Sequence, residues 1–98
     1  MSFKLYLSKQ ADSDLHALAE HPSMDKRLKA VRKALGYLEV NVRHPSLHTH
    51  KFSGIKGING AEVFEAYAEN NTSNAFRIFW QYGIEKQALT VLGIVAHP

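Results

Sequence analysis

The sequence predicts an α+β protein with an N-terminal strand, a helical hairpin and then an antiparallel β-meander, in the order β-α-α-β-β-β-β. Two observations support this prediction. Between Ser8 and Asn41 apolar residues recur at helical spacing, whereas from Ser46 onward short β-like runs alternate with turn residues. Because 98 residues can support one hydrophobic core and no second one, we expect a single domain over residues 1–98.

The first strand and the first helix follow each other directly. Residues 3–7 alternate in strand fashion, and Ser8 is of a type that caps helices. The helix then carries Ala11, Leu15 and Leu18 at helical spacing. Pro22 disfavours helical geometry in His21, so the helix should end there, and Ser23 offers a cap for the next helix.

The second predicted helix is amphipathic and basic, and it ends before Asn41. Its apolar residues fall within a narrow arc at 100° per residue, and lysines fall opposite. The apolar set is Met24, Leu28, Val31, Leu35 and Leu38, and the lysines are Lys26, Lys29 and Lys33. One stripe should therefore pack inward while the other faces solvent.

Four strands are predicted after the helices, at roughly 49–55, 62–69, 75–82 and 88–96, with a glycine-rich turn at 54–60. A symmetric hairpin at 70–74 places Tyr67 opposite Arg77, and closure at 83–87 places Gly93 opposite Arg77 on its other side. One face then collects Glu65, Tyr67, Arg77, Phe79, Gln81, Gly93 and His97. The core face collects Phe76, Ile78, Trp80, Leu92 and Ile94.

Composition narrows the classes of function. No cysteine is present, which excludes disulfides and thiolate catalysis. The longest apolar runs fall far short of the roughly 20 residues that cross a bilayer, and no secretory signal precedes the first strand, so we expect a cytoplasmic protein. Residues 26–56 hold eight positive side chains and one acid, Glu39, a balance of +7 that suits a polyanionic partner.

Arg77 and His97 are the main catalytic candidates. Arg77 interrupts an apolar run, and its guanidinium can grip a phosphate and stabilise the charge that develops during strand scission. An ion pair with Glu65 on the neighbouring strand is an equally good interpretation. The imidazole of His97 suits proton transfer in RNA cleavage, although a solvated terminal histidine is the commoner case.

Further candidates border the same sheet face. His50 is a candidate proton donor, Lys51 a phosphate contact, and Lys56 an added charge. Glu65 is either a general base toward a ribose 2′-hydroxyl or the partner of Arg77. Tyr67 and Phe79 are candidates for stacking on RNA bases.

No cofactor or metal is expected. His44, His48 and His50 invite a metal hypothesis, but no well-placed Asp or Glu completes a site.

The chain resembles RelE/ParE-type toxins of bacterial toxin–antitoxin pairs over nearly its whole length. The resemblance rests on the helix sequence LSKQADSDLHAL and on the ordered combination of Pro45-Ser-Leu, Lys51-Phe-Ser-Gly, Phe64-Glu-Ala, Phe76-Arg-Ile and Val95-Ala-His97. It implies a metal-independent, ribosome-dependent endoribonuclease that enters the A site and inhibits translation by cutting messenger RNA. The products would be a cyclic phosphate and a free 5′-hydroxyl, and the neutralising partner would be an antitoxin that covers the basic groove.

Within this resemblance, Arg77 matches the strand arginine that contacts the phosphate, and His97 matches the near-terminal histidine of YoeB-like and YafQ-like branches. His50 and Lys51 fall where other members place a histidine or lysines. Pro98 departs from the YoeB-like aromatic residue, and the terminal basic cluster of the RelE kind is missing. Two alternatives therefore stay open: a ParE-like, non-catalytic inhibitor of DNA gyrase, and a degenerate toxin that only binds an antitoxin or nucleic acid.

Overall fold

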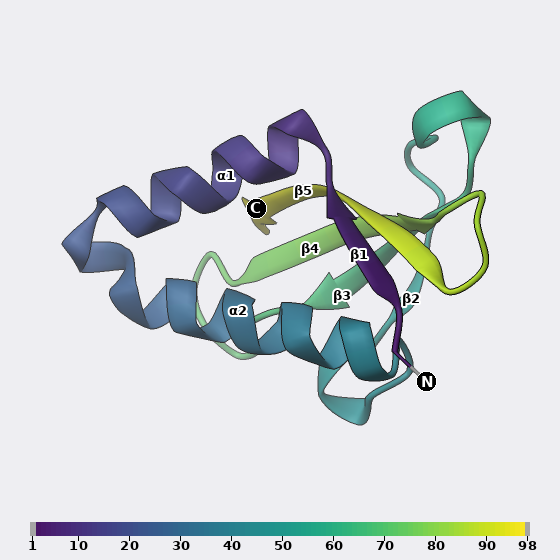
Figure 1. Cartoon of the computed structure of the whole chain (residues 1–98). Helices are drawn as coiled ribbons and strands as arrows, with labels where there is room; N and C mark the ends of the chain where they lie inside the picture. Colours follow the sequence, from purple (N-terminus) through teal and green to yellow (C-terminus); the bar gives the residue numbers. More distant parts are fainter. Residues whose placement is uncertain (1, 98) are drawn as a thin grey trace.

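The computed structural model describes residues 2–97 and has the α+β architecture that the sequence predicts (Figure 1). The helices and strands are β1 (Lys4–Leu7), α1 (Lys9–Glu20), α2 (Asp25–Val40), β2 (His50–Phe52), β3 (Val63–Tyr67), β4 (Phe76–Tyr82) and β5 (Ala88–Ala96). Three short 3-10 turns complete the order: η1 (Pro22–Met24), η2 (Pro45–Leu47) and η3 (Ile58–Gly60). The predicted order of elements is therefore confirmed. Pro98 lies outside the described residues.

The strands form one five-stranded mixed sheet in the order β1-β5-β4-β3-β2. Strands β2 to β5 are the predicted antiparallel meander, whereas β1 joins the far edge parallel to β5. Helices α1 and α2 pack on one face of this sheet (Figure 1). Neither α1 nor α2 covers the other face, on which the short η3 turn contacts Gln81.

The two helices begin differently. Ser8 caps α1 as predicted, since its Oγ accepts a hydrogen bond from Ala11 N at 3.0 Å. The predicted cap at Ser23 is wrong, because Ser23 lies inside the η1 turn that Pro22 starts, and α2 begins after Met24 without a side-chain cap. The amphipathic pattern of α2 is confirmed: Leu28, Val31 and Leu38 are buried, and Met24 and Leu35 pack beside them.

The register between strands is partly as predicted. Tyr67 does pair with Arg77. On the other side, however, Arg77 pairs with Val95, and Gly93 pairs with Phe79. A bulge between Phe79 and Trp80 then shifts the pairing by one residue, because it inserts an extra residue on β5.

The bulge also changes the core. Leu92 was expected to point toward the helices, but it is only partly buried, and Leu89 and Val91 are fully buried in its place. Trp80 and Ile78 from β4 pack with them at 0% exposure.

No helix among the described residues is long and apolar enough to cross a membrane.

Strand β5 extends beyond the residues that pair with β1, and side chains of α1 and of its capping residue bind the backbone of this extension. Asp14 accepts a hydrogen bond from Ile94 N at 2.9 Å, and Ser8 Oγ donates to Leu92 O at 3.0 Å. Backbone groups at a sheet edge otherwise stay unpaired. Helix α1 therefore fixes the part of β5 that leads toward His97.

Candidate functional site

Four of the predicted catalytic residues meet on the sheet face that no described helix covers. Register pairs His50 with Glu65, Glu65 with Phe79, and Tyr67 with Arg77, so these side chains lie on one side of β2, β3 and β4. A cavity of about 170 Å³ borders three of them, Glu65, Arg77 and His97, whereas His50 lies outside its lining. Its lining consists of Phe52, Glu65, Arg77, Phe79, Val95, Ala96 and His97.

Glu65 is the centre of this cluster. It is 6% exposed, and its Oε1 lies 2.7 Å from His50 Nε2 while its Oε2 lies 3.8 Å from Arg77 Nε. A carboxylate that is removed from water needs such partners, because an unpaired buried charge is costly. Glu65 therefore ties the edge strand β2 to the strand that carries Arg77.

His50 is held from both sides of its ring. Its Nδ1 lies 2.8 Å from the carbonyl oxygen of His48, opposite the contact of its Nε2 with Glu65. A carbonyl oxygen accepts hydrogen bonds only, and an ionised carboxylate does the same. Both contacts are hydrogen bonds at once when the imidazole carries two protons, or when Glu65 carries one. In either of these two states, one proton lies between His50 Nε2 and Glu65 Oε1.

Arg77 is held by main-chain oxygens and by an aromatic ring. One terminal nitrogen, Nη1, donates to Glu69 O at 2.6 Å, and the guanidinium carbon lies 3.6 Å from the centre of the Tyr67 ring. The Nε atom is buried and has no hydrogen-bond partner. The residue is 8% exposed and borders the cavity. Arg77 thus forms the ion pair that the sequence suggested, and it does so at the wall of the cavity.

His97 joins the cluster from the end of β5. Its backbone nitrogen donates to Ala75 O at 2.7 Å, which continues the pairing of β4 and β5 by one step. Its side chain is exposed and borders the cavity. The structure therefore brings His97, Arg77 and Glu65 around one space, as the sequence predicted from a shared face.

The two lysines lie elsewhere. Lys51 pairs with Phe64, so it points away from the cavity side of the sheet, and its Nζ lies 3.1 Å from Glu62 Oε1. Lys56 is exposed in the loop after β2 and does not line the cavity. The structure does not bring either lysine to the cluster.

The two aromatic candidates for base stacking differ. The ring of Tyr67 is already covered by the Arg77 guanidinium and lies near the rings of His48 and His50. Phe79 borders the cavity and packs edge-on against Phe52, with ring centres 5.0 Å apart. Phe79 is thus better placed for a base than Tyr67.

Sequence reasoning missed three residues that shape the site. Phe52 walls the cavity, and the period of two along β2 places it on the same side as His50. His48 and Glu69 act through carbonyl oxygens, which no side-chain pattern reveals. His44 does not join the other two histidines, because it stacks on Tyr37 at a ring distance of 3.8 Å.

Comparison with solved structures shows that the chain has the fold of RelE/ParE-superfamily toxins. It is similar to a chain of the archaeal RelE–RelB complex from Pyrococcus horikoshii OT3, with 14% identity, a TM-score of 0.65, and coverage of 98% of this chain and 96% of that one. A YoeB/ParE toxin from Agrobacterium tumefaciens gives 11% identity, a TM-score of 0.70, and coverage of 98% and 100%. A metal-bound toxin from Helicobacter pylori gives 19% identity and a TM-score of 0.66, with coverage of 97% of this chain and 94% of that one.

No protein-family model matches the sequence, and no curated protein is significantly similar to it. At these identities, the comparisons establish the fold.

Proposed function

We propose that this chain is the toxin of a type II toxin–antitoxin pair and that it cleaves messenger RNA on the ribosome. The observation that supports this proposal is the group of Glu65, Arg77 and His97 around one cavity, with His50 in contact with Glu65, within a toxin fold. Histidines, a carboxylate and a guanidinium are the groups that metal-independent phosphoryl transfer needs. Because its substrate is a message under translation, the protein would act in the cytoplasm.

In the proposed reaction, the ribose 2′-oxygen forms a bond to the adjacent phosphorus, and the bond from phosphorus to the 5′-oxygen breaks. The 2′-hydroxyl proton passes to a base, and a second proton reaches the 5′-oxygen. The products are a 2′,3′-cyclic phosphate and a 5′-hydroxyl. Arg77 stabilises the charge on the phosphate oxygens, and the cavity beside it receives the phosphate.

The proton carriers are assigned from their positions. His97 is exposed at the rim and takes the 2′-hydroxyl proton. His50 is assigned the proton that reaches the 5′-oxygen, because its ring lies between Glu65 Oε1 and the carbonyl oxygen of His48. Glu65 orients both His50 and Arg77, which its burial and its two contacts favour over a role as a freely exchanging base.

The proposed protein partner is an antitoxin. The solved complex from Pyrococcus horikoshii contains RelE together with RelB, and this chain has the same fold as its toxin relatives. The excess positive charge of residues 26–56 includes exposed side chains along α2, such as Lys26, Arg32 and Lys33. An acidic segment that folds on binding could cover this surface.

A second candidate function is inhibition by binding alone, as in a ParE-like gyrase inhibitor. The way Arg77 is held favours it: one terminal nitrogen is occupied by the main chain, and the ring of Tyr67 covers one face of the guanidinium. Such a protein would arrest growth and leave messages intact.

Mapping of transcript 5′ ends after induction tests the proposal. Wild-type protein should produce cuts in phase with codons in translated messages, and Arg77→Ala and His97→Ala should remove them. Arg43→Ala is the matched control, because Arg43 is exposed in the loop after α2 and away from the cavity. Growth arrest with intact messages would support the gyrase alternative instead.

A further inference from the structure

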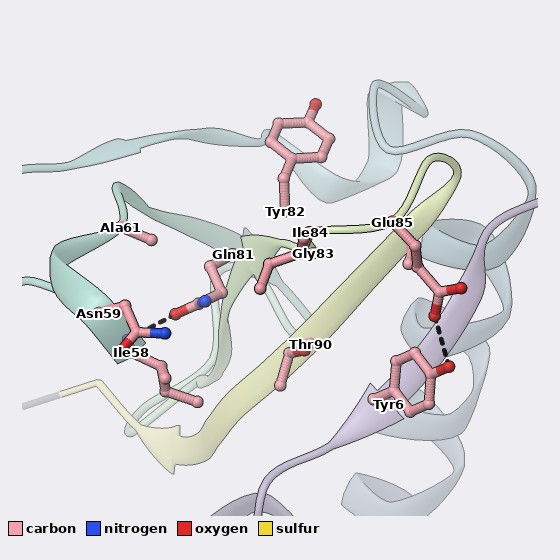
Figure 2. A pocket seen from close by; sticks show the side chains of 11 residues that line it. Tyr6, Ile58, Asn59, Ala61, Gln81, Tyr82, Gly83, Ile84, Glu85 and Thr90 are labelled. Carbon is pink, nitrogen blue, oxygen red and sulfur yellow. Dashed lines mark hydrogen bonds between the residues drawn. The ribbon is translucent and has the colours of Figure 1, made fainter.

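A second and larger cavity, of about 560 Å³, lies on the same sheet face (Figure 2). Gln81, which lines it, lies toward the opposite end of β4 from Arg77. Three side chains form its floor in one row across the sheet, because Gln81 of β4 pairs with Thr90 of β5, which pairs with Tyr6 of β1. Ile58 of η3 walls one side, and Glu85 of the β4–β5 loop lies at the other (Figure 2). The catalytic cluster uses none of these residues.

Gln81 is held in a fixed orientation. It is 8% exposed, and its Oε1 accepts a hydrogen bond from the backbone nitrogen of Ile58 at 2.7 Å (Figure 2). A backbone N–H only donates, so the carbonyl end of the amide must face it. Gly57 makes the approach possible, because a Cβ at that position would lie 2.2 Å from Gln81 Oε1. The NH2 group is thereby left for another partner.

That NH2 group reaches the cavity. Within residues 2–97 the NH2 group donates to no acceptor. Among these residues, the buried side-chain polar atoms that lack a partner are Arg77 Nε and Trp80 Nε1, so the unpartnered Gln81 Nε2 is not a buried atom. The Nε2 of Gln81 is therefore open to the space that the residue lines. A donor that belongs to a side chain as buried as that of Gln81 and is fixed in direction is suited to a ligand with a carbonyl acceptor.

The rest of the floor offers a hydroxyl and an aromatic ring. Thr90 can donate or accept, and the ring of Tyr6 is 42% exposed, with its hydroxyl donating to Glu85 Oε1 at 2.5 Å. Tyr6, and more weakly Glu85, raise the pKa of Lys4, whose Nζ lies 5.5 Å from the centre of the Tyr6 ring. A ligand with a flat ring and polar edges would match the aromatic ring and the hydrogen-bonding groups that line this cavity.

We propose that this cavity binds an unpaired base of the RNA whose phosphate lies at Arg77, with Gln81 donating to a carbonyl group of that base. This inference rests on the proposed function. Gln81 lies four residues beyond Arg77 along β4, or about 13 Å, which a short single-stranded segment can span. Between them lie Phe79 and Phe52, so the face presents aromatic rings and hydrogen-bond donors in one line, as single-strand readers do.

The test is binding of a fluorescent 2′-O-methyl hexanucleotide, which lacks the attacking hydroxyl and so cannot be cut. Gln81→Glu keeps the oxygen that Ile58 N needs and replaces the NH2 donor, so the dissociation constant should rise about five- to tenfold. Thr90→Val should raise it as well. Asn41→Asp is the matched control: its Oδ1 also accepts from a backbone nitrogen, that of Arg43, far from the cavity. Its affinity should equal that of wild type.

A second readout follows the Gln81 side-chain amide by NMR during the same titration. Its signals should shift as RNA is added, and heat unfolding of each variant checks that the fold is retained. Unchanged affinity of both Gln81→Glu and Thr90→Val would overturn the inference. So would amide shifts that depend on protein concentration alone, because a second copy of the chain would then occupy the cavity.

The two proposals fail separately. If wild-type protein cuts no message on ribosomes but hexanucleotide binding still depends on Gln81, the proposed function is wrong and the base site remains. If messages are cut and binding ignores both substitutions, the function remains and the base site is wrong.

Discussion

The Nε2 atom of His50 lies 2.7 Å from Oε1 of Glu65, and this contact joins the edge strand β2 to the buried centre of the candidate site. Glu65 also lies near Arg77, so one carboxylate contacts both the imidazole of His50 and the guanidinium of Arg77. The arrangement makes Glu65 important for stability as well as for the orientation of both neighbours.

Removing the Glu65 carboxylate should destabilise the protein strongly. Glu65→Ala leaves Arg77 buried without its counter-charge, and the free energy of unfolding should fall by about 3 kcal/mol. Glu62→Ala is the control on the same stretch of chain, because its pair with Lys51 is exposed and should contribute less than about 1 kcal/mol. Urea unfolding measures both; equal losses would contradict the role given to Glu65.

Asp14 should contribute more to the stability of the protein than Asp12, although both residues lie on α1. Asp14→Ala leaves the backbone nitrogen of Ile94 without its acceptor, which should lower the free energy of unfolding by about 1–3 kcal/mol. Asp12 is exposed, and its Oδ2 lies 3.5 Å from Nδ1 of His16 on the next turn of the same helix, so Asp12→Ala should change stability by less than about 0.5 kcal/mol. Hydrogen exchange at Ile94 should also accelerate in Asp14→Ala, and protection equal to wild type would refute this account.

Two glycines should respond to alanine in opposite directions. In Gly57→Ala the new methyl group would meet Gln81 Oε1, so the bond to Ile58 N should break, at a cost of about 1–3 kcal/mol. Gly36 lies within α2 with no atom within 4 Å of an added Cβ. Gly36→Ala should therefore stabilise the protein by about 0.5–1 kcal/mol. Thermal unfolding of both variants checks the signs, and a neutral Gly57→Ala would mean that the loop moves freely.

Local sequence patterns predict the fold and the pairing of β3 with β4 in the site. The asparagine-rich turn at 70–74 fixes the hairpin, and it correctly places Tyr67 beside Arg77. The other side of β4 required the position of one bulge, which no periodicity encodes, so the pairing partner of Gly93 and the burial of Leu92 were predicted wrongly. Period-two alternation also forbids His50 and Lys51 from sharing a face, a signal that was present in the sequence and would have removed Lys51 from the site.

The cavity at Gln81 illustrates the other limit of sequence reasoning. Alternation along β4 places Gln81 on the face of Arg77, but nothing local shows that the η3 turn returns to hold its amide. That contact joins residues 23 positions apart in the chain. Long-range contacts of this kind decide which polar side chains are fixed.

Cleavage by purified protein on programmed ribosomes tests the central claim most directly. The message carries either ribose or a single 2′-deoxy sugar at the site that transcript mapping identifies. We predict a 2′,3′-cyclic phosphate product from the ribose message, no cut in the deoxy message, and no cut by Arg77→Ala on either. Cleavage of the deoxy message, or cleavage by Arg77→Ala at the wild-type rate, would contradict the proposed chemistry.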